Sequence, residues 1–494
     1  MKISKILLAA ALALTCITTS AQKDKKLVDK TVTRQGVEAA ISFIASDELR
    51  GRQTPSPGLD IAAKYLSTSL FAAGALTVPG IDTYFQEVKM VSSSPPSKGL
   101  FATRDSSYSV DNELIYIGGS SVNIEAPVVY AGYGNEDDFS DLDVKGKIVV
   151  LQAGQKTDRG AMSAFKSGAT KVALANEKGA LAVIELFNSP QPNWKILRYY
   201  LSNTKVALDY GEQDDESIPH IWLEDVNNNR RPYFESYVGN ASLTIAGNEI
   251  KKFTTKNVIG YVEGTDSKLK DEFVIYSAHY DHVGVGEPDL DGDSIFNGTR
   301  DNAIGTATVL KAAENIAKYP LKRSSIFIFF TGEEKGLLGS EWYVDHPLVP
   351  LEQVVYCFNS DNGGYNDTSA ATIIGIERTT AESVLRKACE AYGLQATKDP
   401  VPEQNLYDRS DQVSFAKVGI PALMYGMGIT DFGEEITRYY HKQADNPNSV
   451  DYDYLYKFTK AYVLACRLVG NMPERPYWIK GDKYYDAGQS LYGK

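Results

Sequence analysis

Apolar positions recur along the chain with two different periods. Over residues 39–45 and 60–73 they follow helical spacing, and Gly74 stands where a C-terminal cap is expected. From residue 257 onward, short continuous apolar runs alternate with helical segments such as 303–318; the runs cover residues 273–278, 326–330 and 354–358. Such runs are typical of strands buried on both faces. The pattern predicts an α/β fold, a three-layer α/β/α sandwich with a mixed, largely parallel central sheet.

The pattern of apolar positions changes over residues 121–249. Strand-like runs at 128–130, 148–151 and 181–187 accompany a helical pattern at 165–178, and histidines or acidic pairs do not cluster there at ligand spacing. We therefore expect a smaller, β-rich inserted module without chemistry of its own. A Ser- and Pro-rich interval at 92–97 indicates a loop or boundary. The predicted regions are 1–21, a targeting segment; 22–120 and 250–494, the main domain; and 121–249, the insert.

The first 21 residues have the features of a signal peptide. Lys2 and Lys5 precede an apolar run over 6–17, and Thr19-Ser20-Ala21 suits cleavage after Ala21. Thr15 precedes Cys16 where a lipobox needs a smaller residue, so an exported soluble protein, periplasmic or secreted, is favoured over a lipoprotein. We find no later apolar run long enough for a membrane span.

Composition narrows the function classes. Of 494 residues, 43% are hydrophobic, which excludes a wholly disordered or coiled-coil chain. A net charge of −12 without a basic stripe argues against a nucleic-acid partner. Behind the signal segment, Cys357, Cys389 and Cys466 can form one bridge at most, and they contain no CxxC pair. Cysteine chemistry is therefore not expected.

Polar side chains collect where the predicted strands end. His279 and Asp281 close the first run, Glu333-Glu334 follow the second and Asp361 the third, while Asp301 opens a helix and His441 lies far downstream. Singly, these residues have ordinary explanations, such as a capping box at 331–334, an N-cap at Asp301 or a turn at Asp361. Ligands gather beyond the carboxyl ends of parallel strands, however, and the chain has only five histidines. Joint placement therefore favours one site.

The donor types point to metal. Two imidazoles and three carboxylates suit Zn²⁺, with Co²⁺ or Mn²⁺ as substitutes; the expected ligands are His279, Asp301, Glu334, Asp361 and His441. Asp281 suits a carboxylate that orients His279. Glu333 would be the general base for a water shared by two ions.

Two local motifs fail on inspection. Asp289-Leu-Asp291-Gly-Asp293 has Ser294 where a calcium loop needs Gly and Arg300 where it needs a bidentate Glu. Gly284-Val-Gly286 has no third glycine and no following helix, so a dinucleotide site is not expected.

The clusters resemble the co-catalytic-zinc exopeptidase family, which includes leucyl-type aminopeptidases, glutamate carboxypeptidase and the inactive transferrin receptor. The resemblance rests on segments 277–282, 297–305, 331–334, 359–361 and 440–441, with 45–52 similar to the family's opening region. The insert resembles a protease-associated domain through segments 131–134, 143–147 and 178–180. The resemblance implies a peptide substrate and two zinc ions per chain. It also implies that Asp301 bridges the ions through a following cis peptide, and that Tyr440 binds the oxyanion.

Departures from the family pattern leave specificity open. Thr299-Arg300 replace Ala-Asp before the bridging residue, so Arg300 would weaken metal affinity or contact an anionic substrate. Gln412 stands where relatives have His, in a segment expected to form a pocket wall. His282 is expected to be structural or to support a ligand. An aminopeptidase is the favoured function; the alternatives are a carboxypeptidase for acidic C-termini using Arg300 and Arg409, a single-zinc glutaminyl cyclase, and a non-catalytic receptor-like protein. The oligomeric state is not predicted.

Overall fold

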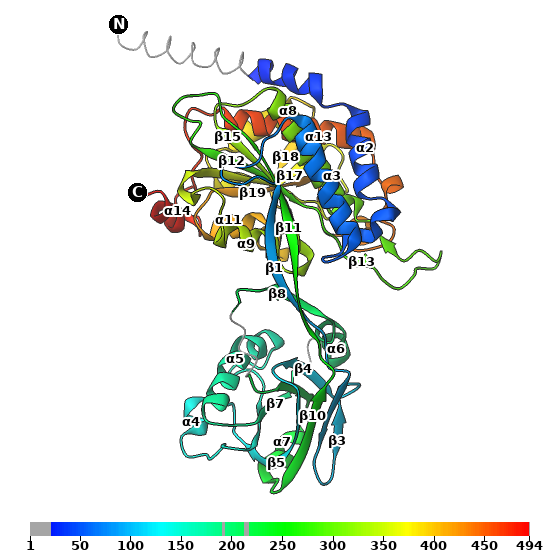
Figure 1. Ribbon diagram of the computed structural model, residues 1–494, viewed down its shortest axis with the longest axis vertical. Coiled ribbons are helices and arrows are strands. Elements are labelled where there is room, and N and C mark those ends of the chain that lie inside the picture. The colour runs from blue at the N-terminus through cyan, green and yellow to red at the C-terminus, as the bar shows by residue number, and fades with distance from the viewer. Residues whose placement is uncertain (1–20, 190–192, 212–216, 494) are drawn as a thin grey trace. The chain divides into compact units, whose positions relative to one another are not determined.

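The computed structural model describes residues 21–189, 193–211 and 217–493. The chain forms two compact units, one of residues 1–88 and 254–494 and the other of Lys89–Phe253 (Figure 1). The predicted signal peptide and Cys16 lie outside the described residues, apart from Ala21. In the part of the chain that is described, no helix is both long and apolar enough to cross a membrane.

The larger unit is built on a mixed sheet. Its strands run in the order β18-β17-β19-β16-β12-β15-β11-β1, and β1 continues past residue 88 to pair with β8. The four central strands β19, β16, β12 and β15 are parallel, whereas β11 joins β15 and β17 joins β19 in antiparallel register. The strands are β1 Phe85–Ser93, β8 Lys205–Leu208, β11 Ile250–Val262, β12 Phe273–His279, β15 Ser324–Phe330, β16 Val354–Ser360, β17 Ala370–Ile374, β18 Gln395–Thr397 and β19 Ala422–Met427.

Alternate residues of these strands enter two separate cores. Tyr276 of β12 packs in the core that includes helix α8, whereas its neighbour Ile275 packs in the core on the opposite face. The first face is covered by α2 Arg34–Ile44, α3 Pro57–Ala73, α8 Ile304–Lys318, α10 Glu382–Glu390 and α13 Tyr452–Gly470. The second is covered by α9 Leu338–Asp345, α11 Gln412–Lys417 and α14 Tyr485–Leu491. The predicted three-layer arrangement is therefore confirmed.

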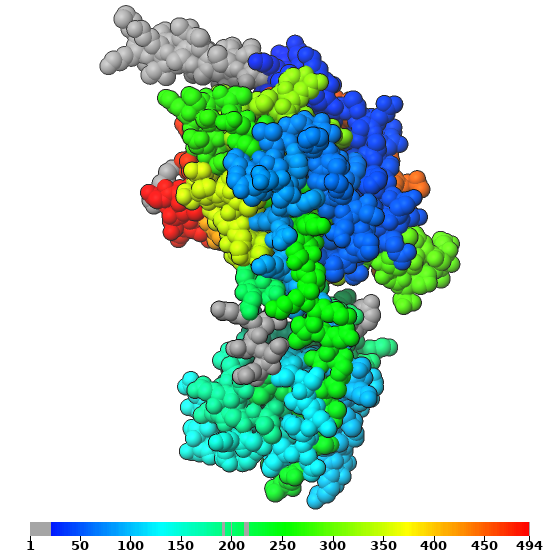
Figure 2. All heavy atoms as spheres, viewed as in Figure 1, coloured from blue at the N-terminus to red at the C-terminus, as the bar shows by residue number. Residues whose placement is uncertain are grey.

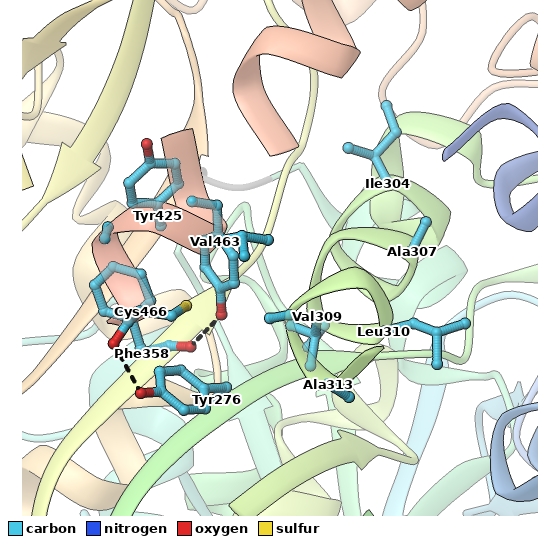
Figure 3. Packing of buried hydrophobic residues seen from close by; sticks show 14 of the residues in the cluster. Tyr276, Ile304, Ala307, Val309, Leu310, Ala313, Phe358, Tyr425, Val463 and Cys466 are labelled. Atoms are coloured by element: carbon cyan, nitrogen blue, oxygen red, sulfur yellow. Dashed lines mark hydrogen bonds between the residues drawn. The ribbon is translucent and has the colours of Figure 1, made fainter. Parts of the chain in front are cut away.

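The first core also buries tyrosine hydroxyls, each with a partner. Tyr276 donates to the carbonyl of Cys466 at 3.0 Å, and Tyr462 donates to the carbonyl of Phe358 at 2.9 Å (Figure 3). These bonds satisfy polar groups that would otherwise be costly to bury. Cys357, Cys389 and Cys466 are all free and buried, so no bridge links them.

Local sequence accounts for the helix ends. At α3, the Ser56 side chain accepts a hydrogen bond from the Leu59 amide and Pro57 occupies the first turn. Gly74 ends the helix with φ of 86°, a left-handed conformation that favours glycine.

The smaller unit contains an eight-stranded sheet in the order β3-β2-β10-β5-β6-β7-β9-β4. Its strands are β2 Lys98–Ala102, β3 Ser107–Ser109, β4 Leu114–Gly118, β5 Val122–Tyr130, β6 Ile148–Gln152, β7 Ala182–Phe187, β9 His220–Glu224 and β10 Asn240–Ala246; its helices are α4 Glu136–Phe139, α5 Ala161–Glu177, α6 Trp194–Leu201 and α7 Arg230–Ser236. The insert was expected to begin at residue 121, but the unit begins at Lys89. Strand β2 pairs with β10 and β4 pairs with β9, which binds residues 98–118 to this unit.

A cluster of charged side chains is buried in this unit. Glu185 is fully buried and lies 2.9 Å from the Lys171 ammonium and 2.8 Å from the His220 imidazole, and it accepts a bond from the Trp222 indole at 2.9 Å. Sequence spacing gave no sign of it because Glu185 and His220 stand on neighbouring strands 35 residues apart. The paired charges act as a structural element of the sheet.

Candidate metal centre

The predicted ligands meet at the carboxyl edge of the central sheet. His279 is the last residue of β12, Glu333 and Glu334 follow β15, and Asp361 follows β16. Asp301 lies directly before α8, and His441 follows the short helix α12, Glu434–Thr437. The parallel order of β12, β15 and β16 thus brings together residues up to 162 positions apart, His279 and His441.

Four nitrogen-to-oxygen separations describe the arrangement. The His279 Nε2 atom lies 3.2 Å from Asp361 and 3.3 Å from Asp301, and the His441 Nε2 atom lies 3.2 Å from Asp301 and 3.2 Å from Glu334. Charge-assisted N–H···O bonds are shorter, about 2.7–2.9 Å. Two ligand atoms that each lie about 2.0–2.1 Å from a tetrahedral zinc ion stand about 3.3 Å apart. The separations therefore fit donor pairs that share a cation, and the donor types fit zinc.

Asp301 contacts both histidines with different oxygens. Its Oδ1 atom faces His279 and its Oδ2 atom faces His441, as a carboxylate between two ions would. The peptide bond from Asp301 to Asn302 is cis, as the family resemblance implied.

His282 supports a ligand. Its Nδ1 atom lies 2.7 Å from Glu334 Oε1, a direct hydrogen bond, which leaves Glu334 Oε2 facing His441. His282 is fully buried, so this bond fixes the orientation of the Glu334 carboxylate.

Glu333 and Asp281 lie beside the ligands. Glu333 Oε2 is 4.0 Å from His279 Nε2, farther than any ligand pair above, and it lines the hollow described below. Asp281 is buried, with its Oδ1 atom 3.8 Å from His279 Nδ1; the same carboxylate accepts bonds from the Glu333 amide and the Thr54 hydroxyl. Asp281 thus connects the strand end that carries His279 with the loop that carries Glu333.

Burial and mutual charge set the protonation of these groups. Burial, together with the Asp301 charge, would raise the pKa of Glu334, but bonds from His282 and His441 outweigh both and lower that pKa to about 2. Burial opposes the charge of His441, yet Asp301 and Glu334 raise its pKa to about 10. Burial raises the pKa of Glu333 well above the ordinary value; the charge of His279, 4.0 Å away, opposes this rise, and the charges of Asp361 and Glu334 add to it. A divalent cation would satisfy the same carboxylates.

A hollow opens from the ligands. It encloses about 720 Å³ including its open mouth, and its walls are mostly apolar, formed by Ile374, Leu406, Met424, Met427, Ile429, Phe432 and Ile436. Tyr440 also lines it, stacked on the His441 ring with a centroid distance of 4.2 Å. Burial raises the pKa of Tyr440, so its hydroxyl stays protonated and can donate.

Arg300 does not face this hollow. Its guanidinium lies 3.5 Å from the Tyr439 ring centre and 4.5 Å from that of Tyr365, and it donates to the Ser449 carbonyl at 2.7 Å. The side chain is only 3% exposed. The expectation that Arg300 contacts an anionic substrate is therefore wrong, because the two rings enclose its charge.

The other departure, Gln412, is also internal. Its amide donates to the Tyr407 carbonyl at 2.6 Å and accepts from Asn359 at 3.0 Å. The segment 407–412 does form part of the wall, as predicted, but through Arg409 and Ser410.

Three supporting residues were not assigned a role from the sequence. Asp445 accepts bonds from the backbone amides of Arg300 and Asp301 and so fixes the bridging segment. Asp411 is fully buried, and burial raises its pKa to about 7. Arg52, also buried, donates to four backbone carbonyls around the site, those of Ile44, Tyr280, Asn297 and Gly298. Arg52 belongs to segment 45–52, which resembles the opening region of the family, whereas no local sequence pattern distinguishes Asp445.

The acidic hairpin set aside earlier is outside the site. Strands β13 Gly284–Val285 and β14 Ile295–Phe296 carry a loop that projects from the surface (Figures 1 and 2). Asp289 accepts bonds from the Asp291 and Asp293 amides, which makes this an ordinary turn.

A nitrogen- and oxygen-rich donor set at this edge defines a metal-binding α/β protein. Residues 257–465 match peptidase family M28, and residues 124–225 match the PA domain. The similarity to peptidase family M28 therefore lies in the larger unit, and the segment that matches the PA domain lies inside the smaller unit.

Two named relatives are similar over most of the chain. Aminopeptidase YwaD of Bacillus subtilis is 28% identical over 330 residues, which cover 65% of this chain and 62% of that protein. Leucine aminopeptidase 2 of Arthroderma otae is 24% identical over 385 residues, covering 71% and 68%. The chain thus spans less than two thirds of the YwaD sequence.

Solved structures show the same fold. The aminopeptidase from Aneurinibacillus sp. strain AM-1 superposes with a TM-score of 0.61 at 20% identity, covering 91% of this chain and 97% of that one. BSAP, a zinc aminopeptidase from Bacillus subtilis, superposes with a TM-score of 0.51 at 21% identity. The superposition covers 92% of this chain and 98% of that one.

Proposed function

We propose that the chain is an exported two-zinc aminopeptidase that removes apolar N-terminal residues from peptides. One observation carries the proposal: His279 and His441 each lie 3.2–3.3 Å from two carboxylate oxygens. One of the two oxygens in each case belongs to Asp301, which presents a different oxygen to each histidine. His279 and Asp361 would hold one ion, His441 and Glu334 the other, and Asp301 both. The names of the relatives support the reaction class.

The residues of the chain supply the remaining chemistry. Bound zinc polarises a peptide carbonyl and lowers the pKa of a water molecule. Glu333 accepts the proton of the attacking water and returns it to the departing amine. The Tyr440 hydroxyl donates to the oxygen that gains negative charge. The apolar wall receives the side chain of the N-terminal residue, and each buried methylene contributes about 0.8 kcal/mol.

The test combines metal analysis with a substrate panel. We expect two zinc ions per chain by mass spectrometry and cleavage of leucyl naphthylamide faster than the aspartyl compound. Glu333→Gln should retain the metal and lose at least about a hundredfold in kcat, because it removes the general base. Activity only on N-blocked dipeptides would instead indicate a carboxypeptidase, and a single zinc ion would favour a cyclase.

Export needs a separate experiment. Expression of the full sequence in a bacterial host should give a periplasmic or secreted protein whose first residue is Gln22. A protein that keeps Met1 in the cytoplasm would contradict this part of the proposal.

A further inference from the structure

The hollow beside the metal centre contains one cationic side chain among the described residues, that of Arg409. At the same site the lining includes four carboxylates, of Asp301, Glu333, Glu334 and Asp361. The remaining wall is largely apolar. A positive group therefore faces a pocket whose other charges are negative.

Arg409 is exposed and has no acidic partner in the described part of the chain. Its recorded bond runs from Nη2 to the neutral Tyr440 hydroxyl at 3.4 Å. The adjacent Asp408 does not neutralise it, because that carboxylate pairs with Lys483 at 2.7 Å. The guanidinium is thus free to bind a carboxylate with its paired donors.

Distance limits which carboxylate can reach it. An oxyanion bonded to the Tyr440 hydroxyl would lie about 2.7 Å from it, so the guanidinium stands within about 6 Å of the oxygen of the bond to be cleaved. One extended residue spans about 3.3–3.6 Å. The carboxylate of the residue next to that bond therefore lies within reach, whereas that of a long peptide would lie farther away.

Resting on the proposed function, we propose that Arg409 binds the C-terminal carboxylate of short substrates and makes dipeptides preferred substrates. A dipeptide zwitterion matches the hollow at both ends, with its ammonium toward the acidic groups and its carboxylate toward Arg409. An acidic side chain is the other source of a carboxylate. The apolar wall disfavours it there because burial without a partner is costly.

The test compares Leu-Ala with Leu-Ala amide, which differ only in the terminal charge. Zinc-loaded wild-type protein should cleave the free acid with a kcat/KM about tenfold higher, typical of a hydrogen bond to a charged group. Arg409→Gln should bring this ratio close to one while leucyl anilide is still cleaved, and Arg409→Lys should restore part of it. Arg438→Gln is the matched control, since Arg438 is exposed but does not line the hollow.

Each other result overturns the inference in a distinct way. If Arg409→Gln lowers kcat/KM equally for Leu-Ala and for Leu-Ala amide, Arg409 acts only by positioning Tyr440. Equal wild-type rates on both, or a preference for Glu-Ala amide over Leu-Ala amide that depends on Arg409, would exclude the terminal carboxylate as its ligand. Failure to cleave any free-amine substrate would overturn the proposed function, and this inference with it.

Discussion

Asp281 illustrates how a residue outside the ligand set shapes the centre. Its Oδ1 atom lies 3.8 Å from His279 Nδ1 and accepts a hydrogen bond from the Glu333 amide at 3.1 Å. Burial raises its pKa to about 6, although the nearby His279 opposes that rise. The carboxylate therefore positions the loop of the base and adds a nearby negative charge to His279, whose Nδ1 atom has the Asp281 main-chain carbonyl as its hydrogen-bond partner at 3.3 Å.

Asp281→Asn tests this role. We expect the variant to fold and to bind zinc about ten- to hundredfold more weakly, because groups that orient metal-bound histidines typically contribute that much. Titration with a chelating competitor measures the affinity. Asp289→Asn, on the projecting hairpin, is the control and should bind as the wild type does; unchanged affinity in Asp281→Asn would argue against the assignment.

Most of the centre could be predicted from sequence because its residues follow strands, which converge by a general rule of parallel sheets. Asp445 could not be, since it acts from a loop through backbone amides that any residue at 300 and 301 would provide. The orientation of Arg300 also depends on Tyr365 and Tyr439, which are 65 and 139 positions away.

At the scale of elements, Arg300 links three segments that each carry an expected ligand. It precedes Asp301, packs on Tyr365 four residues after Asp361, and packs on Tyr439 two residues before His441. Cation–π contacts of buried arginine are worth about 2 kcal/mol. The link is therefore strong enough to matter for the geometry of all three loops.

Arg300→Met should loosen these loops. We expect zinc retained after dialysis to fall from two ions toward one, because His441 is the most exposed ligand, and we expect a lower melting temperature. Arg300→Lys should be intermediate, since it keeps the charge without the planar group. Full zinc retention in the Met variant would show that the loops hold their positions independently.

The buried cluster of the smaller unit predicts a pH dependence of stability. Burial alone would raise the pKa of Glu185, but the His220 bond and the Lys171 charge outweigh it and lower the folded-state pKa. The unfolded chain therefore protonates Glu185 more readily than the folded chain does. The stabilisation that the ionised Glu185 provides is complete above about pH 4.5 and is lost as the pH falls through the folded-state pKa.

Urea unfolding followed by tryptophan fluorescence at pH 6 and pH 3.5 measures the effect, since Trp222 bonds to Glu185. Glu185→Gln should lower the free energy of unfolding by about 3 kcal/mol at pH 6, because Lys171 is left buried without its counter-ion. Between pH 6 and pH 3.5, the free energy of unfolding should also fall less in the variant than in the wild type. Parallel pH curves for the two proteins would mean that other groups dominate.

The helices and strands of both units were largely predictable because their apolar periods are long and regular. The start of the insert was not. Strand Lys98–Ala102 is short, and its membership depends on pairing with residues more than 100 positions away; strand Ser107–Ser109 joins the sheet only through Lys98–Ala102. The smaller compact unit begins at Lys89, close to the Ser- and Pro-rich interval at 92–97.

At the scale of the whole molecule, the two compact units, each with hydrophobic cores of its own, imply two unfolding events. Metal should stabilise only the unit that binds it, by about 4 kcal/mol when free zinc is a thousandfold above its dissociation constant. Chelation followed by calorimetry should therefore lower one transition and leave the other in place. A single transition that shifts as a whole would show that the units unfold together.

The strands that enter and leave the smaller unit lie side by side. The Ile259 amide donates to Tyr84 at 2.7 Å in the larger unit, and the Ser94 amide donates to Glu249 at 2.9 Å in the smaller one. In evolutionary terms, an entire module is inserted along the chain between two neighbouring strands, where a short turn would be enough to connect them. The same geometry makes this position a natural junction for grafting a different module onto the catalytic framework.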